Sequence, residues 1–182
     1  YVVLMDPHRP GHSRSYYPSE AQVRMADVIL IAKSRSATAE NIASEKALAA
    51  ELNPRAQVIC VDSKLTLMGH DESILKGKRV VVVEDGPTTT HGGMLYGAGT
   101  LLAQRAGAEI VDPRPYFVGE LADTLAKYPN VGPLVPAMGY SDKQQADLLA
   151  TIDNVPCDFV VSGTPIELAD LIKTKQPIYS VS

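Results

Sequence analysis

Aromatic residues and cysteines are scarce in this chain of 182 residues. It has no tryptophan, two phenylalanines and two cysteines, Cys60 and Cys157, which stand far apart beside apolar runs. Cysteines in such positions are typical of buried, reduced thiols, although a disulfide between them stays open. This usage gives no sign of an oxidising compartment and excludes a small domain that depends on many disulfides.

The chain also lacks an excess of positive charge. Lysine and arginine total 17 and aspartate and glutamate total 21, so the net charge is −4. This balance excludes the basic footprint of a nucleic-acid-binding domain and the polybasic patch of a membrane-surface protein. No apolar run approaches the ~20 residues of a membrane span, and no signal peptide is visible. We therefore expect a cytoplasmic location, with no nucleic-acid partner and no membrane partner.

What the chain does contain is a regular alternation of short apolar runs and helical patterns. Continuous β-branched runs are typical of strands that are buried on both faces of a parallel sheet. Alternation with helices predicts an α/β fold with a mostly parallel, doubly wound sheet. The predicted strands are Tyr1–Met5, Val28–Ala32, Gln57–Val61, Arg79–Val83, Glu109–Val111, Leu134–Ala137 and Phe159–Val161.

Helical patterns fill the intervals between these strands. Thr38 is an expected N-cap of the first helix, and Ser141 is an expected N-cap of the fourth. The predicted helices are Thr38–Leu52, Gly93–Ala106, Tyr116–Lys127, Ser141–Ile152 and Pro165–Lys173. Both chain ends are strand-like, so residues 1–182 are either a single α/β domain or the C-terminal fragment of a longer nucleotide-binding protein.

Polar and glycine residues follow nearly every predicted strand. In open parallel sheets, ligands bind outside the carboxyl ends of the strands, so these residues are the candidates for a site. Asp6 and Arg9 follow the first strand, Lys33 follows the second and Arg114 follows the fifth. A turn alone does not require so many charged side chains.

The richest of these segments follows the fourth strand, within Val80–Gly93. Its glycines, Gly86, Gly92 and Gly93, allow several backbone N–H groups to converge on one point, and a helix start there favours anions. The hydroxyls of Thr88, Thr89 and Thr90 add donors. We interpret the segment as an anion-handling loop; a Gly-rich turn that caps a helix is the alternative.

Acidic and imidazole groups in the same regions suggest further roles. Asp6, Glu84 and Asp85 are candidate Mg²⁺ ligands, because Mg²⁺ prefers carboxylate and substrate oxygens. His91 is a candidate charge partner or proton donor. The guanidinium of Arg114, held between two prolines, suits a phosphate or carboxylate. His8 and His12 do not form a zinc pair, because Pro10 and Gly11 prevent the helix that would align them.

Two familiar nucleotide-binding motifs are absent. No G-x-x-x-x-G-K-[ST] loop occurs, and Gly69–Lys78 has the wrong spacing for one. No G-x-G-x-x-G occurs, and Gly97-Ala98-Gly99 lies inside a helical pattern. The Val80–Gly93 segment is therefore better placed on the side of the substrate or transferred phosphate than at the phosphates of ATP.

Four blocks of sequence resemble the cyclic 2,3-diphosphoglycerate synthetase family. They are V-V-V-V-E-D-G-P-T-T-T-H-G-G-M-L-Y-G-A-G, E-I-V-D-P-R-P-Y, G-P-L-V-P-A-M-G-Y and V-S-G-T-P-I-E-L, in that order. The resemblance covers most of the chain from about Asp6, and it implies a P-loop NTPase-like fold whose Walker A part lies upstream of Tyr1. It also implies a ligase that uses ATP and Mg²⁺ to close 2,3-diphosphoglycerate into an intramolecular phosphoanhydride.

As a hypothesis for that reaction, the strand-end residues take the following roles. His91, Arg9 and Arg114 would be catalytic; Gly86, Thr88, Thr89, Thr90, Gly92, Gly93 and Lys33 would bind phosphate; Asp6, Glu84 and Asp85 would hold the metal. The partner would be a small phosphorylated metabolite, and a homo-oligomer stays open. The fragment alone would be inactive.

Two alternatives stay open. One is a P-loop-class NTPase, GTPase-like, of another function, although Ala32-Lys33-Ser34-Arg35 stands where such proteins carry a base-reading N-K-x-D, which argues against a strict GTPase. The other is a non-catalytic domain that binds a phosphorylated metabolite, since family likeness does not fix function.

Overall fold

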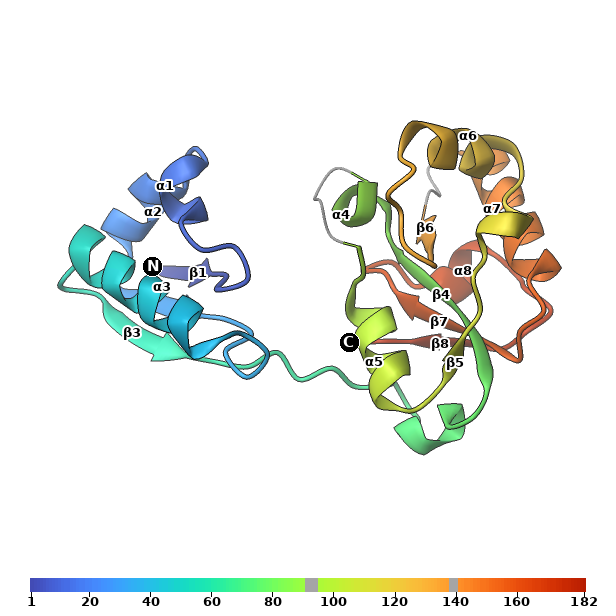
Figure 1. The fold of residues 1–182 in the computed structure, drawn as a ribbon, viewed down its shortest axis with the longest axis horizontal. Coiled ribbons are helices and arrows are strands. Elements are labelled where there is room, and N and C mark those ends of the chain that lie inside the picture. Colours follow the sequence, from blue (N-terminus) through green and yellow to red (C-terminus); the bar gives the residue numbers. More distant parts are fainter. Residues whose placement is uncertain (91–94, 138–140) are drawn as a thin grey trace. The chain divides into compact units, whose positions relative to one another are not determined.

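The computed structural model describes residues 1–90, 95–137 and 141–182, without the side chains of Pro87 and Thr88. The chain divides into two compact units, Tyr1–Lys64 and Leu65–Ser182, shown in Figure 1. The predicted α/β class with mostly parallel strands is confirmed in both units. The sequence predicted one doubly wound sheet, whereas the strands form two separate sheets.

The first unit is a three-stranded parallel sheet with its helices. Its strands pair in the order β1-β2-β3, and the registers place Val2 beside Val28 and Val28 beside Gln57. In chain order its elements are β1 (Val2–Met5), α1 (His12–Ser15), α2 (Ser19–Met25), β2 (Val28–Ile31), α3 (Ala39–Leu52) and β3 (Gln57–Cys60).

Helices α2 and α3 pack on one face of this sheet. Val23 of α2 and Ala49 and Leu52 of α3 join Met5 and Ile29 of the strands in one buried cluster. Helix α3 begins where the sequence predicts, because the Thr38 hydroxyl accepts a hydrogen bond from the Asn41 N–H at 3.2 Å. The core therefore lies between the helices and one side of the strands.

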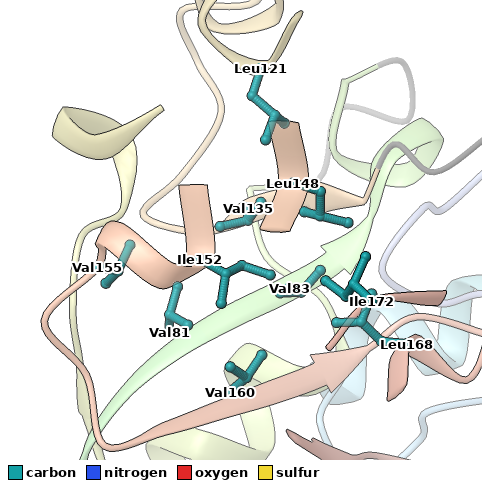
Figure 2. Close-up of a cluster of buried hydrophobic side chains, with 10 residues drawn as sticks. All are labelled: Val81, Val83, Leu121, Val135, Leu148, Ile152, Val155, Val160, Leu168 and Ile172. Atoms are coloured by element: carbon teal, nitrogen blue, oxygen red, sulfur yellow. The ribbon is translucent and has the colours of Figure 1, made fainter. Parts of the chain in front are cut away.

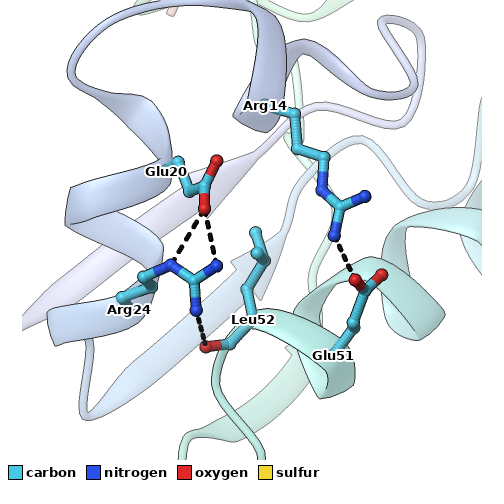
Figure 3. Close-up of polar contacts among 5 residues, drawn as sticks. All are labelled: Arg14, Glu20, Arg24, Glu51 and Leu52. Atoms are coloured by element: carbon cyan, nitrogen blue, oxygen red, sulfur yellow. Dashed lines mark hydrogen bonds and ion pairs between the residues drawn. The ribbon is translucent and has the colours of Figure 1, made fainter.

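Side chains tie the three helices to one another (Figure 3). Arg24 of α2 donates to Glu20 one turn earlier and to the carbonyl of Leu52 at the end of α3, at 3.4 Å. Arg14 of α1 pairs with Glu51 of α3. These pairs are largely exposed, so they orient the helices more than they stabilise the unit.

The second unit is built around a five-stranded parallel sheet with the path β5-β4-β7-β8, and β6 pairs with the last residues of β4. An antiparallel bridge between Leu67 and Val181 links the two ends of the unit. In chain order its helices and strands are η1 (Glu72–Leu75), β4 (Arg79–Asp85), α4 (Gly86–Thr90), α5 (Ala98–Arg105), β5 (Glu109–Ile110), η2 (Arg114–Tyr116), α6 (Gly119–Lys127), β6 (Val135–Ala137), α7 (Asp142–Asn154), β7 (Phe159–Gly163), α8 (Leu168–Leu171) and β8 (Ile178–Ser180).

Both faces of the second sheet are covered, as the valine run of β4 predicts. Val81 and Val83 point to one face, where side chains of α6, α7 and α8 complete the cluster drawn in Figure 2. Val80 and Val82 point to the other face and pack against Leu102 of α5. All four valines are fully buried, so this sheet is doubly wound.

The predicted strands are confirmed, and several helices differ at their starts. The helix predicted from Gly93 begins at Ala98, although residues 91–94 lie outside the described part. The helix predicted from Tyr116 begins at Gly119, and the helix predicted over Pro165–Lys173 spans only Leu168–Leu171. Proline and glycine near these starts favour turns and 3₁₀ geometry over regular helix.

The two cysteines differ in how far they are exposed. Cys157 is half-buried, but Cys60 is exposed, because it lies on the edge strand β3. The prediction of two buried thiols is therefore wrong for Cys60. Among the described residues, no helix has the length and apolar character needed to cross a membrane.

Candidate functional site

The residues predicted to form a site lie at the carboxyl edges of two different sheets. Asp6, Arg9 and Lys33 belong to the first unit, and the other predicted site residues belong to the second. Because neighbouring strands are parallel within each sheet, their ends converge and the segments that follow them lie together.

In the first unit, the structure brings Asp6 and Lys33 together. The Lys33 ammonium donates to the Asp6 carboxylate at 2.8 Å, and the backbone N–H of His8 donates to it at 3.0 Å. Burial alone raises the pKa of Asp6, but the Lys33 hydrogen bond, the His8 N–H and nearby positive charges outweigh it, so the pKa is lowered. Asp6 is a paired carboxylate at neutral pH.

The backbone around this pair is folded back tightly. Lys33 has φ = 52°, in the left-handed region that non-glycine residues seldom adopt. The N–H of Arg9 donates to the carbonyl of Asp6 at 2.9 Å, and the His8 ring contacts the Ser36 hydroxyl at 2.9 Å. The segments after β1 and β2 are thus joined at two points, Lys33 to Asp6 and His8 to Ser36. Backbone strain of this kind gathers at ligand sites.

Glu45 of α3 joins this group and was missed by the sequence analysis. It is only 1% exposed, and one of its oxygens accepts the Gly11 N–H at 3.0 Å. The other oxygen has no hydrogen-bond partner among the described residues. Burial, aided by the negative charge of Asp6, raises the pKa of Glu45 against the opposing effects of Gly11 and His12. Its position three residues after Ile42 and three before Leu48, within the apolar stripe of α3, was the available signal.

In the second unit, Glu84 is a predicted site residue that lies fully buried. It is 1% exposed. Its carboxylate accepts the N–H of Gly97 at 3.1 Å, the N–H of Gly99 at 3.4 Å, and both the N–H and the hydroxyl of Thr100 at 2.7 and 2.8 Å. Burial raises the pKa of Glu84, and these four hydrogen bonds lower it in part. Glu84 thus fills the amino end of α5, where its oxygens accept hydrogen bonds from the backbone N–H groups that begin the helix.

Glycines make room for this carboxylate. A Cβ atom added at Gly97 or Gly163 would overlap the Glu84 side chain, and one added at Gly99 would lie 3.1 Å from the backbone nitrogen of Gly163. The Gly97-Ala98-Gly99 sequence therefore serves the close approach of Glu84, β7 and α5. The donors around Glu84 are already occupied, so the structure gives Glu84 a structural part, and its role as a metal ligand stays a prediction.

The segment after Glu84 is helical rather than an open loop. Asp85 is the last residue of β4, and α4 runs from Gly86 to Thr90. The Thr89 hydroxyl donates to the carbonyls of Asp85 and Gly86 at 3.2 and 3.1 Å, and the Thr90 hydroxyl donates to Gly86 at 2.7 Å. A proline in the first turn favours such a helix. These two hydroxyls serve the helix backbone in this state.

Four of the predicted residues fall at the limit of the described structure. His91, Gly92 and Gly93 lie outside the described residues, as does the side chain of Thr88. Their predicted roles in catalysis and phosphate binding stay predictions.

Arg114 follows β5 and is held by Asp112. Its guanidinium donates to both carboxylate oxygens, with its Nε 2.9 Å from one and a terminal nitrogen 2.6 Å from the other. The hydrogen bonds and opposite charge lower the pKa of Asp112 and raise that of Arg114. About 39% of the Arg114 side chain is exposed, so the guanidinium has a fixed orientation and a solvent-facing side.

The predicted magnesium ligands are divided between the two units. Asp6 lies in the first unit and is paired with Lys33, while Glu84 is saturated by donors in the second. Within residues 1–90, 95–137 and 141–182, no group of three histidine, cysteine or carboxylate side chains could hold a metal ion. The roles of Asp6, Glu84 and Asp85 as Mg²⁺ ligands therefore stay predictions.

Hollows on the first unit lie away from these strand ends. One of about 470 Å³ is lined by residues of α1 and α2, including Arg14, Tyr16, Tyr17 and Arg24. Its two arginines are paired with Glu51 and Glu20. The strand ends, where unlike charges and backbone strain gather, remain the better candidates for a site.

Each unit is thus a parallel α/β sheet with charged side chains gathered at the carboxyl ends of its strands. No family model matches the chain. Arginine synthetase ArcE of Thermococcus kodakarensis is 44% identical to it over all 182 residues. The chain spans 40% of the length of that curated relative.

Proposed function

We propose that the chain is part of an ATP-dependent synthetase. The observation that carries this proposal is its similarity, over every one of its 182 residues, to a protein named as a synthetase. The parallel sheets with charged strand ends support it, because phosphoryl transfer needs positioning and charge neutralisation more than covalent help from the protein.

The step proposed for this chain is the handling of a phosphoryl group and its acceptor. Arg114, oriented by Asp112 and still exposed on one side, would bind a phosphate oxygen or a carboxylate. Lys33 and Arg9 would offset negative charge at the strand ends of the first unit. His91, Gly92 and Gly93 would contribute through the segment that follows α4. Mg²⁺ would accompany the phosphates of ATP, with Asp6, Glu84 and Asp85 as its predicted ligands.

Two products are candidates. The name of the relative favours arginine. A route that fits an ATP-dependent synthetase transfers the γ-phosphoryl group of ATP to the ureido oxygen of citrulline, releasing ADP. Ammonia then attacks the ureido carbon, and that oxygen leaves with phosphate. The four-block resemblance favours cyclic 2,3-diphosphoglycerate. There, ATP phosphorylates one phosphate of 2,3-diphosphoglycerate, and the neighbouring phosphate displaces inorganic phosphate to close the ring.

Calorimetry on the longer protein that contains these residues tests the site. Mg-ATP, citrulline and 2,3-diphosphoglycerate are titrated separately into the wild type, His91→Ala and Arg114→Ala. We expect at least a tenfold loss of affinity for Mg-ATP or for one of the two acceptors in each variant. Unchanged affinity for all three ligands in both variants would contradict the assigned site.

Arg105→Ala is the matched control. Arg105 also forms a carboxylate pair, with Glu72 at 2.5 Å, but it ends α5 rather than following a strand. This variant loses the same charge and a similar ion pair, so its ligand affinities should equal those of the wild type.

A further inference from the structure

One face of the first sheet is apolar and uncovered. Parallel registers align Leu4, Leu30 and Ile59 across the sheet, and they align Val2, Val28 and Gln57 in the next row. Leu4 is 67% exposed, Val2 57% and Ile59 38%. Only one of these six side chains is polar, and none is charged. We call the five apolar side chains, Val2, Leu4, Val28, Leu30 and Ile59, the open face.

An open face is unusual for an all-parallel sheet, because such sheets are normally covered on both sides. The opposite face of this sheet carries the core with α2 and α3. The second sheet of this chain follows the rule, with buried clusters on both faces. Contiguous exposed apolar surface of this kind marks an interaction site.

The topology explains why residues 1–60 cannot cover the open face. The strands advance in one direction, β1 to β2 to β3, and right-handed crossovers then place both connections on the same face. Helices reach the other face when further strands are added on the opposite side of β1, because their crossovers then pass over that face. The second half of a doubly wound sheet is built in this way. More than half of the similar protein lies outside the matched region, which supplies ample length for such a layer.

We infer that the open face is an internal docking surface, buried by amphipathic helices from sequence outside residues 1–182 of the longer protein. The helices would present leucine and other aliphatic side chains to Leu4, Leu30 and Ile59, since the face offers no charge to pair. This arrangement would join the first unit and the added segment around one sheet with helices on both faces. The inference concerns assembly of the chain and does not depend on which reaction the protein catalyses.

Photo-crosslinking tests the occupant of the open face. The photoreactive residue p-benzoylphenylalanine replaces Leu4 in the longer protein, and a second variant carries it at the exposed Ala47 of α3 as the control. We expect the Leu4 variant to crosslink to a peptide outside residues 1–182, and the Ala47 variant not to do so. Crosslinks confined to peptides within residues 1–182, a crosslinked dimer of two copies, or no crosslink at all would overturn the inference.

Thiol labelling tests the same inference through the accessibility of a smaller side chain at position 4. Leu4→Cys is made together with Cys60→Ser, which removes the exposed native thiol. The introduced thiol should react at least tenfold more slowly in the longer protein than in the chain of residues 1–182. Equal rates in the two proteins would show that added sequence leaves the face open, and would contradict the inference.

Discussion

The Glu84 side chain connects the end of β4 to the start of α5 through four hydrogen bonds. We expect Glu84→Ala to lower the free energy of unfolding by roughly 3 kcal/mol or more, because several buried donors would lose their acceptor. Urea denaturation followed by circular dichroism measures the change. Glu109→Ala, at an exposed strand position, is the control and should stay within about 0.5 kcal/mol of the wild type.

Glu45 gives a prediction about pH. Its pKa in the folded chain is raised above the ordinary value of 4.5, so the folded state holds its proton more tightly than the unfolded state does. This contribution to stability is present below pH 4.5 and is lost as pH rises through the folded pKa. Glu45→Gln cannot titrate, so the wild type should lose stability relative to this variant as pH rises above 4.5.

Urea melts of the wild type and Glu45→Gln at a series of pH values test this expectation. The difference between the two proteins cancels the carboxylates with lowered pKa, such as Asp6, whose contribution runs in the opposite direction. A difference that stays constant from pH 4 to pH 8 would mean that the pKa of Glu45 is not raised.

Sequence reasoning at the residue scale identified positions better than partners. Asp6 and Lys33 could be placed together because the ends of neighbouring parallel strands converge. Glu84 was also singled out, but its partners are 13 to 16 residues away in the chain, and only the packing of α5 against the sheet brings them close. The unpartnered oxygen of Glu45 likewise depends on tertiary burial, which a helical pattern does not specify.

The start of α6 depends on one glycine. Gly119 has φ = 53°, and a Cβ atom there would overlap the carboxylate of Asp147 on α7. That carboxylate also accepts the Glu120 N–H at 3.0 Å and so helps to cap α6. We expect Gly119→Ala to lower the free energy of unfolding by about 2 kcal/mol or more, as measured by thermal or urea unfolding.

Gly77→Ala separates the two causes. Gly77 also has a positive φ, 68°, but open space surrounds its Cβ position. Gly77→Ala should therefore lower the free energy of unfolding by about 1 kcal/mol, from backbone strain alone. Equal costs at Gly119 and Gly77 would rule out the steric part of the argument.

At the element scale, strands were predictable because their apolar runs are buried on both faces, as in β4. The first residues of the helices were less predictable from the sequence. The sequence predicts an anion-handling loop in the segment that contains Gly86 to Thr90. The structure instead forms α4 there, with two threonine hydroxyls that donate to the helix backbone. The short helices α1 and α2 have weak periodicity and are held by tertiary contacts such as those of Arg24.

At the scale of the whole molecule, the division into two units could not be read from composition. Residues 61–66, which join them, have no helix or strand, and Lys64 is exposed. We expect limited trypsin digestion to cut first after Lys64 and to give fragments of about 64 and 118 residues, as counted from the unit boundaries. Mass spectrometry identifies the cut, and Lys64→Gln should abolish it. First cleavage within α3 or α7 would contradict the division.

Turnover by the longer protein tests whether this chain serves an ATP-dependent synthetase. The protein is incubated with Mg-ATP and either citrulline plus ammonia or 2,3-diphosphoglycerate, and the products are followed by ³¹P NMR and amino-acid analysis. The account predicts that one pairing consumes ATP and forms arginine or cyclic 2,3-diphosphoglycerate in equal amount, with at least a tenfold loss in Arg114→Ala. ATP consumption no faster than in protein-free controls with both pairings would contradict it.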